Sequence, residues 1–100
     1  MSEGNKVNET QDITNLDIYL LLGLFINILN VQAWQYIGLR AKLGTDKIEK
    51  DFEKANIAID CISFLTDKLE PHIPKDAANK IRNMLLDLQT NFIKKKEESQ

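Results

Sequence analysis

The sequence predicts an all-α domain: a small bundle of three long antiparallel helices, completed by oligomerisation through the first helix. Apolar residues recur at helical spacings in three long segments, and no segment alternates apolar and polar residues as a strand does. The 100 residues include only four glycines and two prolines, so few positions interrupt a helix. We expect helices over residues 15–37, 46–69 and 74–95, with connections short enough to make consecutive helices antiparallel.

Length and composition indicate one domain. We expect a disordered tail over residues 1–14, a single helical domain over 15–95 and a frayed C-terminus over 96–100, because the first segment has no apolar periodicity. The hydrophobic fraction of 43% and the charged fraction of 28% are ordinary for a globular protein. One cysteine excludes a disulfide framework. A net charge of −2 excludes a strong electrostatic attraction to nucleic acid, so we expect no nucleic-acid partner.

The first helix is expected to start near Thr14 or Asn15, because Thr14 and Asp17 resemble a capping box. Gly38 is expected to end it as a left-handed C-cap. One face carries apolar residues at helical spacing and is expected to pack against the other two helices. This face consists of Ile18, Leu22, Phe25, Leu29, Ala33 and Tyr36.

The second helix is expected to begin at Thr45 or Asp46, because Asp46 and Glu49 have the spacing of a capping box. It should stop before Pro71, which disfavours helical geometry in the residue before it. Its apolar stripe comprises Ile48, Phe52, Ala55, Ile59, Ile62, Leu65 and Leu69. Cys61 lies beside this stripe, and we interpret it as a small core residue.

The third helix is expected to open with Pro74 in its first position, where the missing N–H has no cost. Lys94, Lys95 and Lys96 follow its last turn, at the negative end of the helix dipole. Its core-facing residues repeat on one face. They are Ala77, Ile81, Met84 or Leu85, Leu88 and Phe92.

The first helix has no charged residue between Asp17 and Arg40, and its second face is as apolar as the first. Three interpretations compete: a transmembrane helix, a central helix buried within one subunit, and a helix buried between subunits. Four amides, at Asn27, Asn30, Gln32 and Gln35, argue against a membrane partner. Two other helices hardly surround a third, so we favour a homodimer. The expected oligomer interface comprises Leu20, Gly23, Leu24, Asn27, Val31 and Trp34.

No residue pattern predicts catalysis, a metal site or a cofactor. Asp46, Glu53, Asp60 and Asp67 recur every seven residues, and we interpret them as a solvated acidic stripe. The only histidine, His72, lies in a turn, and a carboxylate-lined hydrolase or metal protein using Asp60, Asp67 and His72 is the weakest hypothesis. We therefore expect a non-enzymatic interaction or scaffold protein that acts as a homo-oligomer.

The alternative function is binding of a small apolar ligand. Trp34, Tyr36 and Phe25 are the aromatic residues that would line such a pocket, on the uncharged first helix. The same three side chains are also ordinary packing residues on that helix. Tryptophan fluorescence measured in the presence of a panel of metabolites distinguishes this function from scaffolding.

Residues 33–93 resemble the uncharacterised bacterial family called domain of unknown function 1844. The resemblance rests on three motifs, one for each helix. The first is the helix ending formed by Ala33, Ile37 and Gly38. The second is formed by Phe52, Ala55, Ile59, Asp60, Ile62 and Leu65, and the third by Ile81, Leu85, Asp87, Leu88, Phe92 and Ile93. The sequence departs from the family pattern at Lys42-Leu43 and at Pro71-His72. The resemblance implies a small, helical, cytoplasmic protein and brings no activity and no site.

Overall fold

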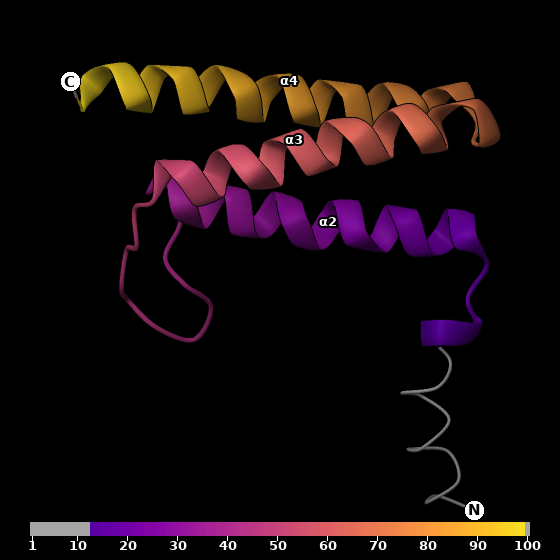
Figure 1. The fold of residues 1–100 in the computed structure, drawn as a ribbon, viewed down its shortest axis with the longest axis horizontal. Coiled ribbons are helices and arrows are strands. Elements are labelled where there is room, and N and C mark those ends of the chain that lie inside the picture. Colours follow the sequence, from indigo (N-terminus) through magenta and orange to yellow (C-terminus); the bar gives the residue numbers. More distant parts are fainter. Residues whose placement is uncertain (1–12, 100) are drawn as a thin grey trace, which may run out of the picture.

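The computed structural model describes residues 13–99, which form three long helices packed side by side (Figure 1). The helices are α2 (Ile18–Ile37), α3 (Phe52–Leu69) and α4 (Lys75–Glu98), with a short 3-10 helix, η1 (Glu70–His72), between the last two. Consecutive helices run antiparallel (Figure 1). There is no strand within residues 13–99, so the all-α prediction is confirmed. The predicted tail lies mostly outside the described residues, and residues 13–15 form a helical turn.

The core is formed by all three helices. Its largest fully buried apolar side chains are Ile26 and Ile37 of α2, Ile62 and Leu69 of α3, and Leu88 of α4. The core also contains three buried alanines and two larger side chains that are slightly more exposed. They are Ala33, Ala55, Ala58, Ile59 and Leu85. The alanines of α2 and α3 leave little side-chain bulk at the helix contact, so these two helices approach closely.

The start of α2 differs from the prediction. The helix begins at Ile18, and Asp17 is its N-cap rather than the far member of a capping box. The Asp17 carboxylate accepts a hydrogen bond of 3.0 Å from the backbone N–H of Tyr19. The predicted end is confirmed, because Gly38 adopts φ 94° and its N–H donates to the Gln35 carbonyl.

The start of α3 was predicted wrongly by six residues. Thr45 and Asp46 lie in a turn, in which the Thr45 N–H donates to the Lys42 carbonyl over 3.0 Å. The N-cap is Asp51, whose carboxylate accepts from the backbone N–H of Lys54 over 3.1 Å. Asp46 therefore lies outside the acidic stripe of the helix.

A tertiary hydrogen bond explains why the helix starts late. The Asp51 N–H donates to the Tyr36 carbonyl over 2.8 Å, which joins the start of α3 to the end of α2. The chain before Asp51 therefore has to span the distance from Gly38 as a loop. Ile48, predicted to lie on the core stripe, is exposed in this loop.

The end of α3 at Leu69 agrees with the prediction, since Pro71 lies in η1. Pro74 precedes α4 as its N-cap and is not its first helical residue. The helix continues to Glu98, three residues beyond the expected end. Lys94, Lys95 and Lys96 therefore lie within the helix rather than after its last turn.

An ion cluster joins α4 to the α3–η1 junction. The Arg82 guanidinium donates to both carboxylate oxygens of Glu70, over 2.6 and 3.3 Å, and to Asp67 over 2.6 Å. The hydrogen bonds from Arg82 lower the pKa of the Glu70 carboxyl below its usual range. Hydrogen bonds to Glu70 and then to Asp67 raise the pKa of the Arg82 guanidinium.

The buried face of α2 is rotated from the predicted one. Ile26, Ala33 and Ile37 are buried, whereas Ile18 and Phe25 of the predicted core face are exposed. The rotation is about half of the ~100° that separates successive residues. Ala33 is buried, and Leu22, Leu29 and Tyr36 pack against the core, so four of the six predicted core-face residues are confirmed. Ile18 and Phe25 were placed wrongly because both faces of α2 are apolar, so the packing partners decide which flank is covered.

Candidate interaction surface

The outer surface of α2 is apolar and largely uncovered. Only three of its 20 residues are buried, and none is charged. Within residues 13–99, α2 is the one helix long and apolar enough to cross a membrane, and 11% of its most apolar window is buried. Leu24 and Val31 are half-buried on this surface, and a groove lies on each side of α2.

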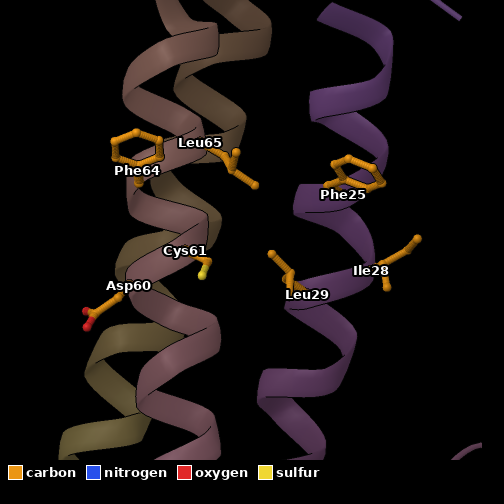
Figure 2. A pocket seen from close by; sticks show the side chains of 7 residues that line it. All are labelled: Phe25, Ile28, Leu29, Asp60, Cys61, Phe64 and Leu65. Atoms are coloured by element: carbon orange, nitrogen blue, oxygen red, sulfur yellow. The ribbon is translucent and has the colours of Figure 1, made fainter. Parts of the chain in front are cut away.

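The first groove, between α2 and α3, has a volume of about 560 Å³. We call it the α2–α3 groove. It is lined by Phe25, Ile28, Leu29, Asp60, Cys61, Phe64 and Leu65. Figure 2 shows Leu29, Cys61 and Leu65 converging between the two helices. The Asp60 carboxylate points away from this convergence, so the floor of the groove is apolar.

Cys61 was predicted to be a core residue, and this was wrong because the thiol is exposed in the α2–α3 groove. The core face of α3 is formed by Ala55, Ala58 and Ile62, which pack against α2 and α4. Cys61 lies one residue before Ile62 and therefore about 100° around the helix from it. The spacing of apolar residues had placed Cys61 next to the stripe without showing that this flank is uncovered.

The second groove lies between α2 and α4 and has a volume of about 530 Å³. We call it the α2–α4 groove. Four of the six predicted interface residues line it, namely Leu20, Gly23, Leu24 and Asn27. Lys80 of α4 also lines it. A methyl group added at Gly23 would meet no atom within 4 Å, so the groove is open there.

The other two predicted interface residues lie elsewhere. Val31 borders a hollow with Lys42 and Leu43 of the following loop. Trp34 is half-buried and packs against the core of its own chain. Asn30, one of the four amides of α2, has a buried side-chain oxygen without a hydrogen-bond partner among the described residues. Asn27 is therefore the amide that remains exposed to a partner.

The structure does not bring the three aromatic residues of the predicted ligand pocket into one cavity. Phe25 lines the α2–α3 groove. Tyr36 lines a smaller hollow, where the Lys54 ammonium lies 5.5 Å from the centre of its ring. Trp34 belongs to the periphery of the core. Phe25 is thus the member that marks an open apolar site.

The polar candidates have separate partners. Asp67 pairs with Arg82, and the His72 ring stacks on Tyr19 with 4.5 Å between ring centres and 13° between ring planes. Asp60 lies at the rim of the α2–α3 groove. In the part of the chain that the structure describes, no group of three or more His, Cys, Asp and Glu residues could hold a metal ion. The geometry therefore offers two apolar grooves rather than a polar reaction centre.

The family assignment follows from the sequence match. Residues 21–94 match the family described as domain of unknown function (DUF1844). The chain belongs to this family. The DUF1844 domain spans most of α2, all of α3 and most of α4, so it contains both walls of the α2–α3 groove. No curated protein and no solved structure matches the chain.

Proposed function

We propose that this DUF1844 protein is a non-enzymatic interaction or scaffold protein that acts as a homodimer through the outer surface of α2. The observation that carries the proposal is an uncharged 20-residue helix with only three buried residues. Contiguous apolar patches of this kind are rare on soluble monomers and are typical of interaction surfaces. The balanced charge of the whole chain supports a cytoplasmic location.

The choice of a subunit partner over a membrane rests on the amides of α2. Asn27 is exposed on the outer surface, and Gln32 is exposed near it. An amide in hydrocarbon loses its hydrogen bonds to water, whereas one beside or within an interface between subunits keeps them or bonds to the partner. In addition, α2 contributes Ile26, Ala33 and Ile37 to the shared core, which ties it to α3 and α4.

The test charges the outer surface of α2. Ile28→Glu with Val31→Glu places four like charges in the dimer and none in the buried core. We expect sedimentation equilibrium to show a dissociation constant raised at least about a hundredfold, with helical circular dichroism retained. The matched control is Leu86→Glu with Ile93→Glu on α4. Leu86 and Ile93 are both exposed, so this variant should leave assembly unchanged. A wild-type protein that is monomeric at tens of micromolar would overturn the proposal.

A second candidate function is the binding of a small apolar ligand in the α2–α3 groove. Its volume of about 560 Å³ lies within the range of ligand sites, and its floor is apolar. Titration with an anilinonaphthalene sulfonate dye tests this function. If the groove binds ligands, Phe25→Ser should weaken dye binding at least about tenfold, while Leu86→Ser should leave it unchanged.

A further inference from the structure

We infer that the partner is a second copy that places its own α2–α3 groove face to face with this one. This inference rests on the proposed homodimer and assigns it to one of the two grooves. The two α3 helices would lie antiparallel about a two-fold axis at Phe64, with the two α2 helices beside them. The product is a four-helix bundle, in which the facing apolar walls are buried.

The polarity of the grooves favours the α2–α3 side. Burial of the α2–α4 groove would desolvate the Lys80 ammonium and the Asn27 amide, and each needs a new partner. The α2–α3 groove has one ionised residue, Asp60, and its carboxylate points away from the floor (Figure 2). A second subunit can therefore cover this groove without burying an unpaired charge.

The outer side of α3 carries exposed apolar side chains that can fill the α2–α3 groove of a second copy. Phe64 is 61% exposed, although it is an aromatic residue in the middle of a helix. Ile57 is exposed two turns before it, and Cys61 is exposed between them. Large aromatic residues at the centre of an interface supply a large share of binding energy. The same surface therefore supplies both the groove and the side chains that fill it, as a two-fold interface requires.

Charge complementarity fixes the orientation. Asp60 and Lys68 flank Phe64 at four residues before and four residues after it. Neither forms an ion pair within residues 13–99, and the Lys68 ammonium lies 5.4 Å from the centre of the Phe64 ring. Antiparallel α3 helices with a two-fold axis at Phe64 bring Asp60 of each copy opposite Lys68 of the other. A parallel arrangement would instead bring each charge opposite itself.

Charge reversal tests this arrangement. Asp60→Lys and Lys68→Asp should each raise the dimer dissociation constant about tenfold, because each places two like-charged pairs in the interface. The double variant exchanges the charges and should restore the wild-type value. Asp87→Lys and Lys94→Asp on exposed positions of α4 make the same changes in net charge and should leave the constant unchanged.

A second pair of variants compares the grooves directly. Ile28→Glu charges the α2–α3 groove, and Leu20→Glu charges the α2–α4 groove; both side chains are exposed on α2. We expect the first to dissociate the dimer and the second to leave it intact. A wild-type dimer that dissociates with Leu20→Glu, or that the double charge reversal fails to restore, would overturn this inference and leave the proposed dimer standing. A monomeric wild-type protein would overturn both.

Discussion

Helices α2 and α4 bury the same number of residues and differ in the charge of their outer surfaces. The buried residues are Ile26, Ala33 and Ile37 in α2, and Ala78, Leu85 and Leu88 in α4. The outer surface of α4 carries lysines, aspartates and amides along its length, whereas α2 has no charge at all. The same burial can therefore be achieved with a polar or an apolar outer surface.

This contrast distinguishes the residues that stabilise the subunit core from the residues that the subunit exposes on its surface. A helix that only completes a three-helix core has no need of exposed Leu20, Phe25 and Ile28 on an uncharged surface, because α4 completes the same core with exposed Leu86 and Ile93 set among charged residues. Burial of a large apolar side chain stabilises by about 1.5–3 kcal/mol. The apolar side chains on α2 can make that contribution only when another molecule covers them.

The largest expected effect tests the shared part of the comparison. Ile37→Ala and Leu88→Ala each remove a fully buried side chain, so each should lower the free energy of unfolding by about 2–5 kcal/mol. Urea unfolding monitored by circular dichroism gives both values. Leu86→Ala, at a position 62% exposed on α4, should change the free energy by less than about 0.5 kcal/mol. A small effect at Ile37 with a large one at Leu88 would show that α2 is not an equal part of the core.

The contrast also explains which parts of the fold the sequence predicts. The helical stripe of α3 and the end of α2 at Gly38 were confirmed, because a stripe opposite polar residues and a left-handed glycine are local signals. The buried face of α2 was predicted only in part, with Ile18 and Phe25 placed wrongly, since an uncharged helix has no charged side to orient it. Only the packing of α3 and α4 selects Ile26 over Phe25.

The start of α3 was missed for a different reason. Asp46 and Asp51 are both acceptable N-caps by residue type. The structure uses Asp51 because its N–H donates to the Tyr36 carbonyl, a contact between segments that no local pattern shows. The exposure of Cys61 and Phe64 has the same origin, because it depends on where α2 lies against α3. The candidate grooves were therefore beyond prediction, although the uncharged run of α2 predicts an interface.

A pair of glycine substitutions sharpens the comparison within α2. Gly38→Ala puts a Cβ on a residue with φ 94°, 3.0 Å from the Lys50 side chain, and should destabilise the subunit by about 1–2 kcal/mol. Gly23→Ala lies in the helix interior with open space beside it and should stabilise it by about 0.5–1 kcal/mol. Thermal unfolding of both variants at one protein concentration gives the two signs. Destabilisation by Gly23→Ala through a weakened dimer would instead indicate that the α2–α4 groove is the interface.

The smallest expected effect concerns the polar side of the molecule, where Arg82 of α4 binds Glu70. The pKa of Glu70 is lowered on folding, so its ion pair stabilises the folded state above about pH 4.5 and is lost as the pH falls through the lowered value. Glu70 is only half-buried and its ion pair is screened by solvent, so Glu70→Gln should lower Tm by only a few degrees at pH 7. Below the lowered pKa the wild type is protonated as well, and the difference should disappear. Asp76→Gln, an exposed acid of the first turn of α4 outside this ion cluster, is the control. A difference in Tm between Glu70→Gln and wild type that stays constant from pH 7 to pH 3 would show that Glu70 acts through packing, and not through its charge.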